Sequence, residues 1–335
     1  MKRHTFLISI LFFSAGIVFS AAEKAPDTIE SLLQVLPKTA KKRERIEIYL
    51  KLADLYVQKA DRKNAVESYR KALEDRPPKK SAYAIWMLIG DMYLLDSQYA
   101  QAIESYQEAV DLAPLAEDAR LKLASAYEQS DLQELARGEY LSILATHRKS
   151  FSANYALAQL YLKQNLNSQA MDYFRKTLTI KPETKVYRQI ALCAGNLGDT
   201  EIAIAMLKRV ISTEENYGDF LNLGSLYQSG KKVSEAEDMF SRAVKLDPSK
   251  PDAYIYLGVL YLGNKDLTPA EKMFQIALEK LPGEALLHFF LANIYFQQNN
   301  VAAAKAEIRR AESLSKTRMI SVYSGKFGKF LNAQQ

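Results

Sequence analysis

The segment "FLNLGSLY" at residues 220–227 returns as "YIYLGVLY" at residues 254–261, thirty-four positions further along the chain. In each copy an aromatic residue, a leucine and a tyrosine are spaced three or four residues apart, which places them on one face of an α-helix. A glycine follows the leucine in both copies, at Gly224 and Gly258, although glycine inside a helix costs about 1 kcal/mol relative to alanine. We therefore predict that another helix packs too closely against this point to leave room for a side chain.

The same pattern occurs along most of the chain when alanine is allowed in place of that glycine. In seven units an alanine lies nine residues after the tyrosine, and a large side chain lies four residues further on, which predicts a second helix with its own apolar face. Five units end in a proline, which stops the second helix before the next unit begins. The further copies of the first segment are "YLKLADLY" (49–56), "WMLIGDMY" (86–93), "RLKLASAY" (120–127), "NYALAQLY" (154–161) and "HFFLANIY" (288–295).

This order of aromatic, leucine-glycine, tyrosine, alanine, phenylalanine and proline resembles the tetratricopeptide repeat. The resemblance covers 46–318 as eight helix-turn-helix repeats. It implies an all-α fold, a right-handed α-solenoid that is stabilised by the stacking of neighbouring repeats. Two repeats depart from the pattern: the one from Glu117 lacks the alanine and the proline near its end, and the one from Thr184 has Ala194 in place of the tyrosine. The lost tyrosine, with two glycines around the turn, predicts a weak joint within 184–216.

Both ends of such an array need a cap, because a terminal repeat would otherwise expose an apolar face. The N-terminal linker and capping helix are expected in 23–45, which contains "PDTIESLLQVLP" (26–37). There Asp27 is the expected helix N-cap ahead of apolar residues with helical spacing. At the other end, 319–335 carries apolar and aromatic residues at roughly helical spacing and is expected to cap the last repeat.

Residues 1–22 have the composition of a Sec-type signal peptide, with a short basic start, an apolar run from Phe6 to Phe19 and small residues from Ser20 to Ala22. We expect cleavage after Ser20 or Ala22 and export, to the periplasm or envelope of a bacterium or, in another cell type, by secretion. The alternative is an uncleaved membrane anchor, although the apolar run is shorter than the roughly 20 residues of a membrane span. Only that alternative would bring the protein into contact with a membrane.

The composition argues against nucleic-acid binding and against catalysis. The formal net charge is +6, of which Lys2 and Arg3 contribute two within the signal segment, and the remaining excess is scattered along the chain. No pair of histidines has metal-ligand spacing, no glycine-rich phosphate loop follows a strand, and Cys193, the single cysteine, has no candidate base close in sequence. We therefore expect no enzymatic activity, no metal site and no cofactor.

The resemblance also implies where a ligand would bind. In tetratricopeptide repeat proteins the first helices line a concave groove, and the ligand-facing positions come just after the aromatic signature residue and beside the signature tyrosine. In this chain those positions are rich in acidic residues before residue 130, and mostly aliphatic or aromatic in the last two repeats. The candidate groove residues are Asp54, Asp91, Leu121, Tyr155, Arg188, Leu221, Ile255, Val259, Leu262, Phe289, Asn293 and Phe296.

Because repeats fill nearly all of the mature chain, the sequence predicts a non-enzymatic scaffold or assembly factor whose groove binds a segment of another envelope or secreted protein. The alternative function is a carrier that encloses a small apolar ligand and serves an envelope transport system. We predict that Phe289 and Phe296 bind a partner's apolar side chains. Leu291 and Tyr295 already supply the packing face of the same helix, so the two phenylalanines are not needed for stacking. The alternative for these two rings is that 319–331 folds over them as a cap.

Overall fold

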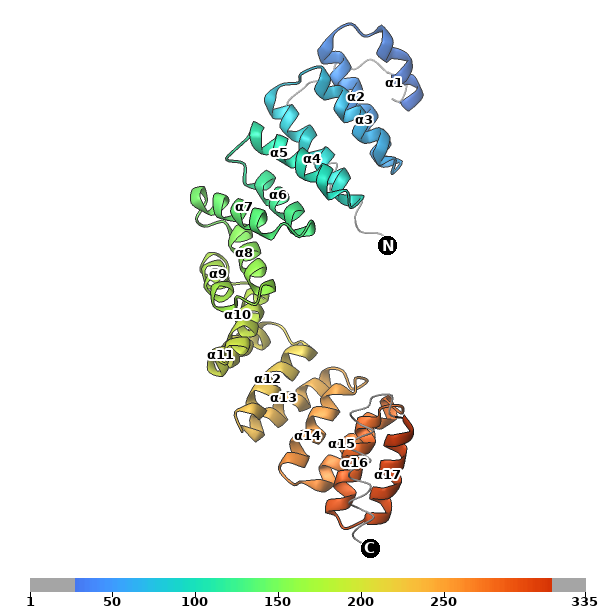
Figure 1. Cartoon of the computed structure of the whole chain (residues 1–335), viewed down its shortest axis with the longest axis vertical. Coiled ribbons are helices and arrows are strands. Elements are labelled where there is room, and N and C mark those ends of the chain that lie inside the picture. Colours follow the sequence, from blue (N-terminus) through green and yellow to red (C-terminus); the bar gives the residue numbers. More distant parts are fainter. Residues whose placement is uncertain (1–27, 315–335) are drawn as a thin grey trace. The chain divides into compact units, whose positions relative to one another are not determined.

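The computed structural model describes residues 28–314, and every regular element in this range is a helix (Figure 1). The chain divides into two compact units, of which the first ends at Leu132 and the second begins at Gln133. This boundary lies inside the repeat that starts at Glu117, one of the two repeats that depart from the sequence pattern. The signal segment 1–22 and the C-terminal segment 319–335 lie outside the described residues.

The first unit is built of two helix pairs, α2 with α3 and α4 with α5, which follow one another in space and are flanked by α1 before and α6 after. Within each pair a short turn joins two helices of similar length, so that they pack side by side. The elements are α1 (Ile29–Val35), the 3-10 helix η1 (Leu36–Lys38), α2 (Lys42–Gln58), α3 (Arg62–Glu74), α4 (Lys79–Leu95), α5 (Tyr99–Leu112) and α6 (Glu117–Gln129).

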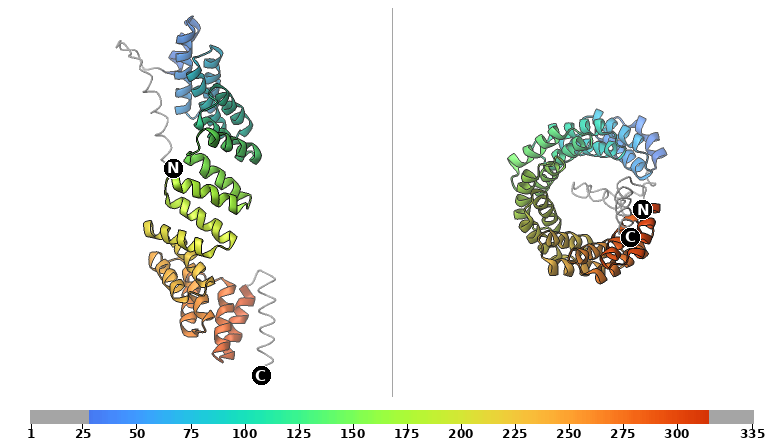
Figure 2. Two further views of the ribbon diagram at one scale, coloured as in Figure 1. Left: turned by 90° about the vertical axis from the view of Figure 1, so that its left-hand side faces the viewer. Right: turned by 60° about the horizontal axis from the view of Figure 1, so that its bottom comes forward.

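The second unit begins with α7 and continues with five helix pairs, each packed against the next (Figure 2). In every pair the odd-numbered helix follows the even-numbered one, and it packs against the first helix of the next pair. Its helices are α7 (Gln133–Thr146), α8 (Phe151–Lys163), α9 (Asn167–Ile180), α10 (Thr184–Leu197), α11 (Thr200–Thr213), α12 (Tyr217–Ser229), α13 (Val233–Leu246), α14 (Asp252–Gly263), α15 (Leu267–Lys280), α16 (Ala285–Gln297) and α17 (Val301–Leu314).

Helix α1 packs against the first pair through Ile29 and Leu32, which are buried with Leu52 of α2. Its N-cap is Thr28: the Thr28 hydroxyl accepts a hydrogen bond from the backbone N–H of Ser31, and the Ser31 hydroxyl accepts one from the backbone N–H of Thr28. The assignment of the N-cap to Asp27 is therefore wrong. Only the residue directly before the first helical residue can place its oxygen on that N–H.

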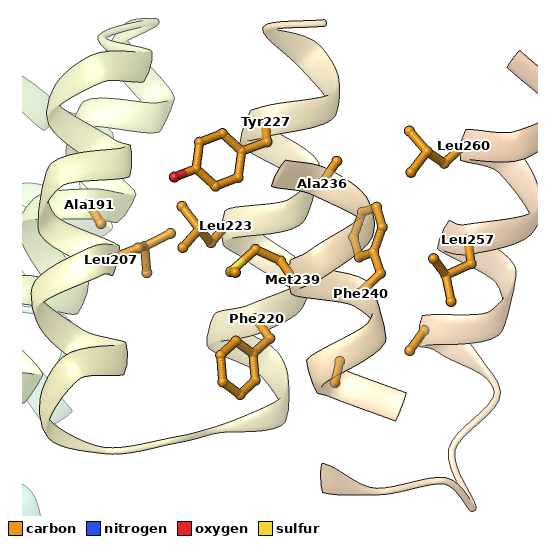
Figure 3. Close-up of a cluster of buried hydrophobic side chains, with 12 residues drawn as sticks. Ala191, Leu207, Phe220, Leu223, Tyr227, Ala236, Met239, Phe240, Leu257 and Leu260 are labelled. Atoms are coloured by element: carbon orange, nitrogen blue, oxygen red, sulfur yellow. The ribbon is translucent and has the colours of Figure 1, made fainter. Parts of the chain in front are cut away.

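The close approach predicted at the repeated glycines is confirmed. A Cβ built on Gly224 would lie 2.5 Å from Cε1 of Phe240, and one on Gly258 would lie 2.7 Å from Cε1 of Phe274. Each aromatic ring comes from the second helix of the same pair and is fully buried. The Phe240 ring also faces Leu257 of α14, the first helix of the next pair (Figure 3). One ring therefore sets the spacing within a pair and also contributes to the stacking between pairs.

The turn inside each pair contains one residue in the left-handed backbone conformation. In the divergent repeat that residue is Gly198, with φ of 81°, and glycine adopts this conformation without a steric penalty. Other side chains are disfavoured there by about 1 kcal/mol. The equivalent turns use Ala60, Ser97, Asp131, Asn165, Lys231, Lys265 and Asn299. Gly198 is therefore the least strained of these turn residues rather than a sign of weakness.

Replacing Gly224 by valine should lower the free energy of unfolding by about 2–3 kcal/mol, because a branched side chain would displace the Phe240 ring from a filled core. The matched control is Gly195→Ala, since Gly195 is an exposed residue of α10 and a Cβ there meets no atom within 4 Å. That control should raise stability by about 0.4–1 kcal/mol. Urea unfolding followed by far-ultraviolet circular dichroism measures both changes, and equal effects of the two substitutions would contradict the close approach.

Candidate functional site

All twelve candidate groove residues lie on first helices of the repeats, and all twelve are half-buried. In the first unit they belong to α2, α4 and α6, and in the second unit to α8, α10, α12, α14 and α16. Each therefore shares its surface between packing and solvent. Half-burial fits a ligand-contacting position, and it equally fits a residue at the edge of the core.

The two acidic candidates of the first unit are tied to their own repeats. The Tyr69 hydroxyl donates a hydrogen bond of 3.2 Å to Oδ1 of Asp54, and the Tyr106 hydroxyl donates one of 2.7 Å to Oδ1 of Asp91. The Asp91 carboxylate also forms an ion pair with Lys122 of α6. Burial raises the pKa of Asp54, and the hydrogen bond from Tyr69 opposes that shift only in part. These carboxylates therefore connect the two helices of a pair while keeping part of their surface in solvent.

Tyr155 belongs to a small aromatic cluster on α8. Its ring is stacked on that of Phe151, with 5.9 Å between centroids, and meets the buried Phe174 ring edge to face. Nζ of Lys185, from α10, lies 5.0 Å from the centroids of both Phe151 and Tyr155. A cation placed over aromatic rings is attracted by their negative faces. Lys185 therefore links α10 to α8 at one end of the candidate surface.

Arg188 forms two ion pairs, one within its own repeat and one that crosses to the next repeat. Its Nε donates to Oδ2 of Asp219 at 2.9 Å, and its Nη2 donates to Oε2 of Glu214 at 3.0 Å. Burial works against the charged guanidinium, but the hydrogen bonds from Arg188 to the two carboxylates outweigh it and raise the pKa of Arg188. Asp219 is buried, with 5% of its surface exposed. Arg188 belongs to the repeat that lost its tyrosine, and it links α10 of that repeat to α12 of the next.

The apolar candidates take part in the packing of the second unit. Ile255, Val259 and Leu262 of α14 pack against a core that includes Leu291 of α16. Leu221 of α12 packs in the same way against the cluster drawn in Figure 3. Stacking of the helices therefore uses part of each side chain that the sequence assigned to ligand binding.

Phe289 and Phe296 pack against the last core cluster, which contains Ala292 of α16 and Ala304 and Ile308 of α17. Both rings are half-buried. The C-terminal segment proposed as their alternative cover lies outside the described residues. Their role as partner anchors therefore stays a prediction.

Sequence reasoning missed two exposed leucines of first helices, of which Leu192 occupies a candidate groove position and Leu286 does not. Leu192 of α10 is 50% exposed and directly follows Ala191, as Asp54 follows Ala53. Leu286 of α16 is 40% exposed and occupies the first turn of its helix. The sequence pattern could have identified Leu192, because this residue follows the alanine of the first-helix pattern as Asp54 does. Leu192 was overlooked in the repeat from Thr184, where Ala194 replaces the signature tyrosine.

The described part of the chain offers no group of three or more histidine, cysteine, aspartate or glutamate side chains arranged to hold a metal ion. No helix within 28–314 is long and apolar enough to span a membrane. Nδ1 of the buried His288 lies 2.6 Å from Oε2 of Glu307, which joins α16 to α17. Burial raises the pKa of the Cys193 thiol to about 11, which disfavours the nucleophilic thiolate.

Sequence profiles of the tetratricopeptide repeat match most of the chain. One profile matches 50–117, 96–146, 221–285 and 266–317, and a second profile of the same description matches 151–184. The chain therefore belongs to the tetratricopeptide repeat family, and its fold is the predicted all-α solenoid. A search among curated proteins found no match.

Solved structures of other proteins share this fold. A tetratricopeptide repeat protein from Parabacteroides merdae is 18% identical, with a TM-score of 0.51, over 86% of this chain and 99% of that one. The C-terminal part of a repeat-containing protein from Cytophaga hutchinsonii is 17% identical, with a TM-score of 0.61, over 70% of this chain and 97% of that one. At these identities the likeness shows the fold and nothing finer.

Hydrogen exchange should test the divergent repeat. If the lost tyrosine makes it a weak joint, amides in 184–216 will exchange faster than those in 251–284, because less apolar surface is buried there. The Arg188→Ala variant should speed exchange further in α10 and α12, since it leaves the Asp219 carboxylate buried without its cation. Adding Asp219→Asn should restore part of the protection. Equal exchange rates in 184–216 and 251–284 of the wild-type protein would contradict a weak joint in the divergent repeat.

Proposed function

We propose that the protein is an exported, non-enzymatic scaffold or assembly factor that binds a segment of a partner protein on the first helices of its repeats. Tetratricopeptide repeat domains in general bind protein partners, and membership of that family is established here by sequence. The observation that carries the proposal is that, within each unit, half-buried side chains recur at the candidate positions of successive first helices. In each unit these side chains offer several contacts to an extended or helical segment.

The two units offer different chemistry to such a segment. In the first unit the candidate positions include Asp54 and Asp91, whose carboxylates keep part of their surface in solvent. In the second unit α14 and α16 offer Ile255, Val259 and the two phenylalanines, with the exposed Leu286 beside them. An apolar patch that stays partly exposed commonly marks a protein interface. The proposed partner for the second unit therefore has apolar side chains that insert between these helices.

Export is proposed from the sequence of residues 1–22, with their basic start, apolar run and small residues. N-terminal sequencing of the protein recovered from the cell envelope should begin at Ala21 or Glu23, because signal peptidase cuts after small residues. A chain that begins at Met1 and fractionates with membranes would favour the uncleaved anchor. A chain found only in the cytoplasm would contradict export altogether.

Capture of a partner from an envelope extract should depend on Phe289 and Phe296. If the rings anchor a partner, the double change to alanine will remove binding, since a buried aromatic anchor is worth roughly 2 kcal/mol or more, and the melting temperature will change little. The control is Leu246→Ala, which removes an exposed leucine from the end of α13, away from the first helices.

A large drop in melting temperature with unchanged binding would instead place the two rings in the core. Mass spectrometry of the purified protein provides a second readout for the function. A tightly bound small apolar molecule, with no captured protein, would favour the ligand carrier over the scaffold.

A further inference from the structure

Asp54 and Asp91 hold the same place in consecutive repeats of the first unit. Each directly follows the small residue of the first-helix pattern, Ala53 or Gly90. Each accepts a hydrogen bond from a tyrosine that comes fifteen residues later, on the second helix of its own pair. The two carboxylates therefore present nearly the same site twice, and the differences between them are informative.

Asp91 pairs with a cation, whereas Asp54 pairs with none within residues 28–314. Nζ of Lys122, on the first helix of the next repeat, forms an ion pair with Oδ1 of Asp91 and lies 5.9 Å from the centroid of the Tyr106 ring. Lys122 stands two residues before Ala124, and the residue two before Gly90 is Leu88. Leucine thus takes the place of the lysine beside Asp54. Among residues 28–314, the Asp54 carboxylate accepts a hydrogen bond from Tyr69 and pairs with no cation.

The negative charge of the Asp54 carboxylate is therefore poorly compensated by positive charge. Burial is the main cause that raises the pKa of Asp54, and among the described residues only the hydrogen bond from Tyr69 opposes it. The side chain is half-buried, so part of it stays within reach of a ligand. A partly buried charge without an opposite charge gains more from an incoming cation than a fully solvated one does, because water screens it less.

We propose that Asp54 binds a lysine side chain of the partner segment, in the way that Lys122 binds Asp91. The pair of Lys122 and Asp91 is our example of how a partner's ammonium group would fit a carboxylate beside a tyrosine ring. The half-buried side chains around Asp54 on this face are apolar and include Leu50, Val57 and Leu88. The residues that flank the lysine in the partner are therefore apolar. This inference rests on the proposed scaffold function and adds the chemistry of the segment that the first unit binds.

The probe is a synthetic peptide mixture with one central lysine flanked by randomised apolar and small residues, and its reference is the same mixture with norleucine in place of lysine. Immobilised full-length protein should retain the lysine mixture about tenfold more strongly, a ratio that corresponds to a single ion pair of moderate strength. The Asp54→Asn variant should lose this preference. Leu88→Lys should lose it too, because it supplies the missing cation from within the chain.

The matched control is the reverse exchange, Lys122→Leu, which removes the cation from Asp91 and should increase retention of the lysine mixture about twofold by opening a second site. Circular dichroism verifies that each variant is folded. The carboxyl carbon signal of Asp54 in NMR titrations provides an independent readout. Its pKa should fall when the lysine mixture is added, and also in Leu88→Lys.

Equal retention of the lysine and norleucine mixtures by the wild-type protein would overturn the inference. So would a lysine preference that persists unchanged in both Asp54→Asn and Leu88→Lys. If the Asp54→Asn variant captures an envelope partner as well as the wild type does, the scaffold function stands and the assignment of Asp54 fails. The two proposals can therefore fail separately.

Discussion

The contact between a small first-helix residue and a second-helix aromatic ring is the interaction on which the rest of the structure depends. At Gly224 and Gly258 the ring lies where a Cβ would be, and at Ala158 the buried Phe174 belongs to the same cluster as the alanine. The ring fixes how closely two helices of a pair approach, and its other face meets the next pair. Because the same side chain performs both tasks, pairing and stacking are formed together. A repeat that lacks a neighbour would leave this ring partly in water, and its burial would then contribute much less to stability.

Polar side chains reinforce these apolar contacts across helices rather than forming a separate site. The hydroxyl of Tyr261 donates to Glu237 and that of Tyr295 donates to Glu271, in each case a bond from a first helix to the second helix of the preceding repeat. Asp54 and Asp91 accept such bonds within their own pairs, and Arg188 bonds to Asp219 of the next first helix. The residues expected to face a ligand are thus also structural, because a first helix has one face toward its neighbours and only a narrow strip left for solvent. Binding on such a strip would use side chains that are already oriented by the fold, which lowers the conformational entropy lost on association.

The fold could be predicted from the sequence because it depends on spacing within about forty residues, and the repeated glycine beside a leucine already indicated the close approach. The candidate surface could be predicted only as a set of positions. Nothing local in the sequence shows that Arg188 pairs with Asp219 or that Lys122 pairs with Asp91, since thirty-one residues separate the partners in each case. The two glycines around the turn after Ala194 suggested weakness, but Gly198 occupies a left-handed turn that most repeats build with bulkier residues. The N-cap is Thr28 and not Asp27. An error of one residue is usual when a helix boundary is predicted from sequence.

The left-handed residue of each turn lies beyond the end of the first helix and is none of the candidate groove residues. A change at Ala60, Ser97, Asn165, Lys231, Lys265 or Asn299 therefore alters the strain of one turn without replacing a candidate groove side chain. Each turn is thus a place where stability can be changed while the candidate groove residues stay the same. A lineage can then accept destabilising substitutions on the first helices while it explores new partners, and recover the loss by single exchanges to glycine in the turns. Stability can be raised separately at each turn whose left-handed residue is not glycine.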